Sequence, residues 1–407
     1  MSEFFDSLET RSADERKSAL AARLPRQISR AKAAPYFAES LRHVDAAAVT
    51  SRAALARLPV IRKHQLIELQ KAHRPFGGLV ATVRAGLARI HASPGPIYEP
   101  EGRGADYWRT ARALFAAGFR GGDLIHNSFS YHMTPGAWIL EAGAQALGCA
   151  VFPGGVGQTE QQAQAMADLQ PDGYVGTPSF LRILLEKTDE LGLAIPSLKK
   201  ALVSGEAFLP PVREALRARG VDGYQAYATA DLGVIAYETV AREGLVVDED
   251  VIVEIVRPGS GDPVAEGEVG EVVVTVFNPD YPLVRFGTGD LSAILPGVSP
   301  CGRTNMRIKG WLGRADQTTK VKGMFVHPEQ VDAVLKRHPE IRRARLVVTN
   351  PDSRDAMTLH CEGAGNATFA AAVAESLREL TKLRGEVAFV ASLPNDGKVI
   401  SDERKFD

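Results

Sequence analysis

The chain has 407 residues, which is enough for two or three domains with a large core. Hydrophobic residues make up 45% of it and charged residues 24%, and the formal net charge of -1 predicts no general attraction to nucleic acid or to an anionic membrane. Cys149, Cys301 and Cys361 are far apart and odd in number, which argues against a disulfide framework and for a reducing compartment. The first residues carry charges where a signal peptide needs an apolar core, and no uncharged run is long enough to span a membrane. We therefore expect a cytoplasmic protein whose partners are small molecules or other proteins.

The first half of the chain predicts helices followed by a parallel sheet. Residues 12–90 are rich in Arg and Ala with Leu at helical spacing, so we expect several short helices divided by Pro25, Pro35 and Pro59. From about residue 105 to 235, helical segments alternate with short apolar runs such as DLIHNSF and KKALVSGE. This alternation predicts βαβ units and a mainly parallel sheet, with functional residues on the loops that follow the strands.

The second half has a different pattern. After residue 235, β-branched and polar residues alternate around Gly/Pro turns, which favours antiparallel strands. The polar segment 310–324 predicts a domain boundary, and the remaining residues predict a small α+β domain with two amphipathic helices. We thus expect an α/β protein with a large N-terminal domain, 1–315, that contains mainly parallel sheets and a β-rich subdomain, and a small C-terminal domain, 316–407.

Three short motifs follow one another towards the C-terminus: GTGD at 287–290, GRAD at 313–316 and GKV at 397–399. Alone, Gly-Asp marks a turn and a single lysine is solvated. Their order resembles that of the adenylate-forming enzymes, the superfamily of acyl-CoA ligases. The segments NSFSYHMTPGAW, GCAVFPGGVGQTEQQ, VSGEAF and FVHPEQVD resemble one branch of it, the phenylacetate–CoA ligase family, and the resemblance extends from the LPVIRKHQL helix to Lys398.

The resemblance implies a two-step reaction. A carboxylate attacks the α-phosphate of ATP to give an acyl adenylate and pyrophosphate, the small mobile C-terminal domain then rotates, and a thiol, usually of coenzyme A, takes the acyl group. It implies that Asp290 binds the ribose hydroxyls and that Arg314 contacts ribose or phosphate. Asp316 falls at the hinge, and Lys398 is the catalytic lysine that stabilises charge at the α-phosphate.

The same resemblance assigns the rest of the nucleotide site. In YATAD, residues 227–231, Tyr227 would stack on adenine and Asp231 would hold Mg²⁺. Ala230 replaces a hydroxyl residue, so a phosphate hydrogen bond is lost, and the segment also fits a helix start after a strand. Gly205 and Glu206 match the loop whose backbone meets the adenine edge.

For the acyl group, the resemblance implies a pocket of Tyr131, His132, Gly155 and Ala228. His132 stands where relatives carry Gly, so it either reads a polar substituent, acts as a base or is a structural histidine. We expect no zinc site. Of the positions that form one in many relatives, Cys301 is kept but Ser299, Tyr237 and Val246 are not ligating cysteine or histidine, and one thiol cannot hold a tetrahedral ion.

The phosphate loop is the main departure from the family pattern. Ser93 and Gly95 of IHASPGPIYEPEG remain as nucleotide-binding candidates, but Pro94 and Pro96 have no N–H. Glu99 and Glu101 bring negative charge towards the same place. These changes oppose binding of the β- and γ-phosphates, unless the loop uses another conformation with donors from elsewhere.

Three hypotheses follow. The first is an ATP- and Mg²⁺-dependent ligase that joins an aromatic or similar planar acid to coenzyme A. The second is a homologue with lost ATP activation that binds nucleotide or acyl adenylate. The third is an adenylating enzyme that delivers the acyl group to an amine or a carrier protein. A homodimer is compatible with each of them.

Overall fold

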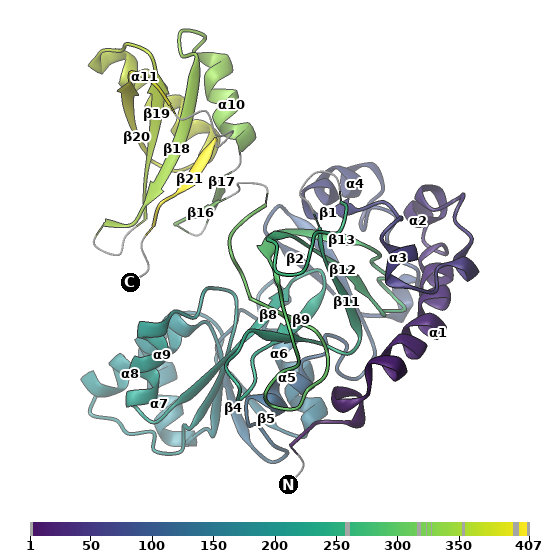
Figure 1. Ribbon diagram of the computed structural model, residues 1–407. Coiled ribbons are helices and arrows are strands. Elements are labelled where there is room, and N and C mark those ends of the chain that lie inside the picture. The colour runs from purple at the N-terminus through teal and green to yellow at the C-terminus, as the bar shows by residue number, and fades with distance from the viewer. Residues whose placement is uncertain are drawn as a thin grey trace. The chain divides into compact units, whose positions relative to one another are not determined.

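The structure, a computed structural model, describes residues 3–256, 261–315, 319–322, 324–326, 328–351, 355–393 and 399–404. The chain divides into two compact units, Met1–Gly313 and Arg314–Asp407, and each has a buried apolar core of its own. Figure 1 shows the elements of both units in chain order. None of the helices within the described ranges is long and apolar enough to cross a membrane.

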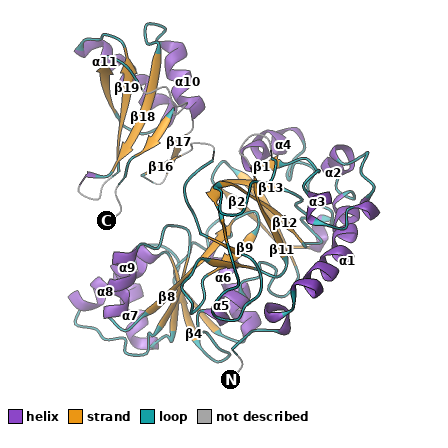
Figure 2. Ribbon diagram, viewed as in Figure 1, coloured by secondary structure: helices purple, strands orange, loops and turns teal. Residues whose placement is uncertain are grey.

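Short helices form the N-terminal segment, as the leucine spacing predicted. Their apolar side chains share one buried core with the strands of the four-stranded sheet β1-β13-β12-β11. Figure 2 shows the helices beside these strands. Pro25 lies inside α1 and does not end it, so that prediction was wrong. The capping box of Ser12 and Glu15 and the burial of Leu24 and Ile28 hold α1 together despite the missing N–H. The helical elements are η1 (Ser7–Thr10), α1 (Ala13–Ala31), α2 (Pro35–Ser40), η2 (Ala46–Ala48), α3 (Arg52–Leu55), η3 (Lys63–Gln65), α4 (Leu66–Ala72) and η4 (Arg84–Gly86).

A nine-stranded sheet has the order β14-β15-β10-β9-β8-β7-β6-β4-β5, and the half from β8 to β5 is parallel, which confirms the predicted βαβ units. Figure 1 shows α7, α8 and α9 together on one face of this half and α5 and α6 on the other. Its parallel strands are β4 (Leu124–Asn127), β5 (Ala150–Pro153), β6 (Gly173–Gly176), β7 (Lys200–Val203) and β8 (Asp222–Thr229). Its helices are α5 (Ala111–Ala116), α6 (Gly136–Leu147), α7 (Thr159–Leu169), α8 (Pro178–Glu190) and α9 (Pro210–Ala218).

The other half of this sheet is antiparallel and begins with the hairpin of β8 and β9. YATAD forms the end of β8 and the turn that follows, so the interpretation as a helix start is wrong. The reason is tertiary, because the apolar residues after Asp231 pair back onto β8 and not onto a helical neighbour. The antiparallel strands are β9 (Gly233–Tyr237), β10 (Leu245–Val247), β14 (Ile294–Leu295) and β15 (Arg307–Ile308).

A second sheet has the order β1-β13-β12-β11, and β11, β12 and β13 are antiparallel, as predicted for the segment after residue 235. The buried Arg285, which precedes β13, pairs with Glu254 at 3.0 Å and donates to the carbonyl oxygens of Ala56 at 2.8 Å and Leu58 at 2.5 Å. It therefore ties the N-terminal segment to this sheet. The strands are β1 (Ile61–Arg62), β11 (Val251–Val256), β12 (Gly270–Val276) and β13 (Phe286–Ser292), and a separate hairpin consists of β2 (Leu87–Ser93) and β3 (Ile97–Gly102).

The second unit has the predicted α+β composition. Its sheet has the order β20-β19-β18-β21, and a two-stranded sheet pairs β16 with β17. Its elements are β16 (Thr319–Val321), β17 (Met324–Val326), α10 (Pro328–Arg337), β18 (Arg343–Thr349), β19 (Ala356–Glu362), α11 (Ala367–Thr381), β20 (Glu386–Val390) and β21 (Ile400–Asp402).

The contact of α5 with α6 requires a glycine. A Cβ at Gly143 would overlap Thr110 and lie 2.7 Å from the backbone nitrogen of Ala111. We expect Gly143→Ala to lower the free energy of unfolding by about 1–3 kcal/mol, because overpacking outweighs the gain in helix propensity. Urea denaturation of this variant beside Gly104→Ala, where an added Cβ meets nothing within 4 Å, measures the difference. Equal stability of the two variants would show that the helices separate easily.

Candidate functional site

Asp290 lies on β13, where its carboxylate joins residues from the two large sheets. The hydroxyl of Tyr227, on β8, donates to Oδ2 at 2.8 Å, and the indole Nε1 of Trp311 donates to Oδ1 at 3.1 Å. The same Tyr227 hydroxyl lies 3.2 Å from the Thr288 hydroxyl. Asp290 is only 9% exposed. A carboxylate oxygen can accept more than one hydrogen bond, so this fixed carboxylate can still accept from a ribose diol.

The structure thus brings together Asp290 and Tyr227, two residues that the sequence assigned to the nucleotide. Stacking of Tyr227 on adenine and binding of ribose by Asp290 stay predictions. Gly205 and Glu206 follow β7, at the carboxyl edge of the parallel strands, and both are exposed. Gly205 has a φ of 84°, which favours glycine, and Oε1 of Glu206 accepts from the Ser179 backbone N–H at 2.7 Å.

The stretch IHASPGPIYEPEG is a β-hairpin of β2 and β3 with its turn at residues 94–96. Both glutamates are buried, so they do not face solvent as free charges. The Ser93 backbone N–H donates to Oε2 of Glu99 at 3.2 Å, and the Ser93 hydroxyl donates to Oε1 of the same carboxyl group. Glu101 contacts His91 Nε2 and Arg89 Nη1, each at 2.7 Å. The two donors of Ser93 are therefore engaged by a carboxyl group of the hairpin itself.

Asp231 lies in the turn between β8 and β9 and is 2% exposed. Its Oδ2 accepts from the Lys63 ammonium at 2.6 Å, while its Oδ1 is buried without a hydrogen-bond partner among the described residues. Burial, and secondly repulsion from Asp231, raise the pKa of Glu99 to about 8. The same two carboxyl groups, after burial, raise the pKa of Tyr281 well above its usual value. Glu99, Asp231, Lys63 and Tyr281 therefore interact electrostatically, and we call these four residues the Glu99 cluster. Lys63 is partly exposed and the other three are buried.

This cluster does not fit a prepared Mg²⁺ site. An ammonium already neutralises Asp231 at 2.6 Å, and the described residues contain no group of three His, Cys, Asp or Glu side chains that could hold a metal ion. A divalent cation would meet the positive charge of Lys63 at short range. The Mg²⁺ contact of Asp231 stays a prediction.

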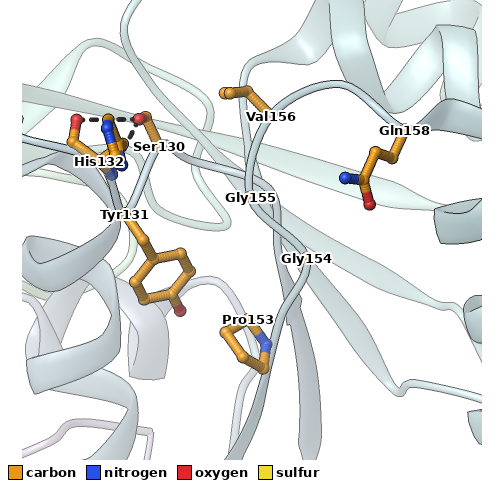
Figure 3. A pocket seen from close by; sticks show the side chains of 8 residues that line it. All are labelled: Ser130, Tyr131, His132, Pro153, Gly154, Gly155, Val156 and Gln158. Carbon is orange, nitrogen blue, oxygen red and sulfur yellow. Dashed lines mark hydrogen bonds between the residues drawn. The ribbon is translucent and has the colours of Figure 1, made fainter.

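A cavity of about 410 Å³ lies between the loops that follow β4 and β5. Figure 3 shows Ser130, Tyr131 and His132 on one side and the segment from Pro153 to Gln158 on the other. It includes Tyr131, His132 and Gly155 of the predicted acyl pocket, whereas Ala228, on β8, is not one of its lining residues. Tyr131 is held by its neighbours, because its hydroxyl donates to Glu141 at 2.6 Å and accepts from Asn127 at 3.0 Å.

Gln162 supports the loop after β5. Its amide nitrogen donates to the carbonyl oxygens of Gly155 at 2.9 Å and Gly157 at 2.7 Å, and its Oε1 lies 2.7 Å from His126 Nε2. His126 is buried between the rings of Phe152 and Tyr174, and burial lowers its pKa. A neutral imidazole that donates to Gln162 therefore fixes one wall of the cavity.

The positions of the family's zinc ligands come together but contain other chemistry. Tyr237 pairs with Val246, and the Tyr237 hydroxyl donates to Glu9 at 2.7 Å. Arg303 also donates to Glu9, at 2.6 Å, while Cys301 lies 3.1 Å from the Ser299 hydroxyl. A buried ion pair thus occupies this region, and the absence of zinc stays a prediction.

The roles of Asp316, Lys398 and Arg314 stay predictions as well. Asp316 and Lys398 lie outside the described residues, and Arg314 is the first residue of the second unit. The sequence analysis missed Lys63, Trp311, Gln162 and the role of Glu99. Trp311 stands two residues before the GRAD motif, and Gln162 lies in the GQTEQQ segment. Their closeness to motifs of the family could have identified these two residues as part of the site.

Comparisons with known proteins agree with this architecture. A crystal structure of 2-hydroxyisobutyryl-CoA ligase, in complex with 2-HIB-AMP and CoA in the thioesterification state, superposes with a TM-score of 0.81 at 26% identity, covering 99% of this chain and 93% of that one. The fold is therefore that of an adenylate-forming enzyme. No protein-family model matches the chain.

Curated sequences identify the branch. The phenylacetate–coenzyme A ligase of Thermus thermophilus is 33% identical over 326 residues, 76% of this chain and 72% of that one. The phenylacetate–coenzyme A ligase of Aromatoleum evansii is 32% identical over 328 residues, 77% of this chain and 73% of that one. The chain belongs to the phenylacetate–coenzyme A ligase family, which confirms the resemblance.

The raised pKa of Glu99 makes stability depend on pH. Between about pH 4.5 and 8 the folded state holds a proton on Glu99 that the unfolded state has released. The stabilisation of the folded state by the protonated Glu99 carboxyl group is fully present below about pH 4.5 and is lost as the pH rises through about 8. We expect the wild-type free energy of unfolding to fall by at least about 1 kcal/mol more than that of Glu99→Gln between pH 5 and pH 8.5.

Chemical denaturation at the two pH values measures this difference. Glu101→Gln is the matched control, because it makes the same change at another buried carboxyl group of β3. Glu101→Gln should keep the decrease in the free energy of unfolding between pH 5 and pH 8.5, and Glu99→Gln should lose it. Parallel slopes for wild type and Glu99→Gln would contradict the raised pKa.

Proposed function

We propose that this chain is an AMP-forming acid–CoA ligase, which activates a carboxylic acid as an acyl adenylate and transfers the acyl group to coenzyme A. The observation that carries the proposal is the contact of Tyr227 with Asp290 at the junction of the two large sheets, in a chain whose relatives are phenylacetate–coenzyme A ligases. When bound, ATP supplies the adenylyl group and coenzyme A the accepting thiol.

In this proposal the first unit binds nucleotide and acid. Asp290 accepts hydrogen bonds from the ribose diol, and the hydroxyls of Tyr227 and Thr288 fix its orientation. The exposed backbone at Gly205 and Glu206 meets the adenine edge. Because both carboxylate oxygens of Asp290 already have protein partners, the carboxylate needs no reorganisation when the nucleoside arrives.

The second unit would act as the lid. Lys398 stabilises the charge that builds at the α-phosphate, and Arg314 adds a forked donor to ribose or phosphate. Asp316 would absorb the backbone rotation between activation and transfer.

The activation step tests the proposal. Incubation with a panel of aryl acids, ATP and coenzyme A should give AMP and an acyl-CoA. We expect Lys398→Ala to slow acyl-adenylate formation by about 10²–10³-fold, since it removes charge stabilisation, and to spare thioester formation from a supplied acyl adenylate. Lys71→Ala, at an exposed lysine paired with Glu68, is the control and should change neither step. Equal losses in both steps would remove Lys398 from the activation chemistry.

The acid itself would bind between the loops of Figure 3. The cavity of about 410 Å³ suits a small planar acid, and the relatives are named for phenylacetate. Of the three roles open to His132, we propose that it reads a polar substituent, because it lines the cavity and is exposed there.

A pair of acids tests this role. We expect His132→Ala to lower kcat/KM about tenfold for a ring-hydroxylated aryl acid, through loss of one hydrogen bond, and to change the unsubstituted acid much less. Val156→Ala, at an exposed apolar position of the same cavity, should affect the two acids alike. If His132→Ala lowers kcat/KM equally for both acids, His132 has a structural role.

A second candidate function is acyl transfer from a supplied adenylate with impaired ATP activation. The engagement of Ser93 by Glu99 favours it. This function predicts that the protein forms acyl-CoA from a synthetic acyl adenylate and coenzyme A but not from the acid and ATP. Replacing coenzyme A by an amine or a carrier protein tests the third hypothesis, in which another acceptor takes the acyl group. A cytoplasmic location and a homodimer stay proposals.

A further inference from the structure

We propose that Glu99 and Lys63 make this site select a nucleoside monophosphate, AMP or an acyl adenylate, over the nucleoside triphosphate. The inference rests on the proposed function, because it assumes a nucleotide whose ribose lies at Asp290. The groups that would meet the terminal phosphates bond to one another: Ser93 to Glu99, and Lys63 to Asp231. Asp290, proposed for the ribose, takes part in neither of these contacts.

The two clusters are neighbours in the fold. Arg62 of β1 pairs with Gly287 of β13, so Lys63, the next residue, lies close to Thr288 and to the Tyr227 hydroxyl that contacts it. Asp231, which Lys63 binds, lies in the turn that directly follows the strand of Tyr227. Asp290, Tyr227, Thr288, Lys63 and Asp231 are thus neighbours in the fold. The hairpin joins them through α4, which follows Lys63: the Gln70 side chain donates to the Tyr98 carbonyl oxygen at 2.9 Å and accepts from the Tyr98 N–H at 2.8 Å, one residue before Glu99.

The hairpin lacks what terminal phosphates need. Phosphates bind to N–H and O–H donors and to cations. Both donors of Ser93 are bonded to Glu99, and Pro94 and Pro96 have no N–H. The ammonium of Lys63 is paired with Asp231.

Glu99 is also shielded from solvent. It is 0% exposed, its carboxyl group accepts from both donors of Ser93, and it interacts electrostatically with Asp231, Lys63 and Tyr281. When it is ionised, it adds electrostatic repulsion to the loss of donors. Each phosphate beyond the first would therefore meet carboxyl groups, while AMP and the AMP half of an acyl adenylate end before them.

Calorimetry on the full chain tests the inference with AMP, ATP and a non-hydrolysable acyl sulfamoyl adenosine. We expect wild type to bind ATP no more tightly than AMP and at least about tenfold more weakly than the acyl adenylate analogue. The informative quantity is the ratio Kd(ATP)/Kd(AMP), because incomplete folding of a variant changes both constants alike.

Substitutions of Glu99 should change this ratio. Glu99→Ala frees the Ser93 donors and opens space, so we expect the ratio to fall at least about tenfold. Glu99→Gln keeps the shape and removes only the charge, so at pH 9 we expect a fall of about threefold, and this variant decides the matter if Glu99→Ala does not fold. Glu101→Gln, the same change at the buried neighbour that binds His91 and Arg89, should leave the ratio at its wild-type value.

The outcomes separate the inference from the proposed function. Tighter binding of ATP than AMP by wild type, or an unchanged ratio in both Glu99 variants, overturns the inference and leaves the ligase proposal standing. Equal falls in the Glu99 and Glu101 variants also overturn it, since the effect would then be a general one of the hairpin. If wild type binds none of the three ligands, the proposed function fails and the inference fails with it.

Discussion

The position of the candidate site depends on one buried cation, Arg285. Its guanidinium pairs with Glu254 and donates to the carbonyl oxygens of Ala56 and Leu58, so the chain before β1 is held against the start of β13. The backbone N–H of Ile61 donates to the Arg285 carbonyl at 3.1 Å, and β1 then runs parallel to β13. A buried guanidinium is tolerated because its donors are satisfied. This attachment brings Lys63 to the strand that carries Asp290.

Two carboxylates, Asp290 on β13 and Asp231 in the turn between β8 and β9, have different environments. Asp290 accepts from a phenol and an indole and stays close to the surface, which suits reversible binding of a ribose. Asp231 is more deeply buried and accepts from an ammonium, next to Glu99. The Lys63 ammonium neutralises Asp231, and the raised pKa of Glu99 favours its uncharged form, so the Glu99 cluster balances its own charges. The residues proposed for the nucleoside and those proposed for the phosphates therefore differ in their electrostatic surroundings, although the β8–β9 hairpin carries Tyr227 and Asp231 of the two groups.

The cavity between the loops after β4 and β5 is fixed in a different way. Its two walls are loops after parallel strands, where side chains from separate βα units converge. Loops alone would be variable, but Gln162 clamps two carbonyl oxygens of one wall and Glu141 with Asn127 orients Tyr131 of the other. The neutral, stacked imidazole of His126 supports Gln162. The shape of the cavity is thus set by hydrogen bonds behind its walls.

The sequence by itself determined the family and the parallel and antiparallel halves, because these depend on periodicity and on motifs whose order is preserved. Its assignment of Tyr227 and Asp290 to one nucleotide site stays a prediction, and only the structure shows their hydrogen bond. The sequence also placed Tyr131, His132 and Gly155 around one cavity. Only the tertiary structure decided that YATAD ends in a β-turn, that α1 runs through Pro25, and that Glu99 is buried with Ser93. Local propensity is weak compared with strand pairing and burial, which overrode it at these places. Lys63 and Asp231 are 168 residues apart in the sequence. No local pattern predicts their ion pair, because it forms only when the tertiary structure brings the residue after β1 to the turn after β8.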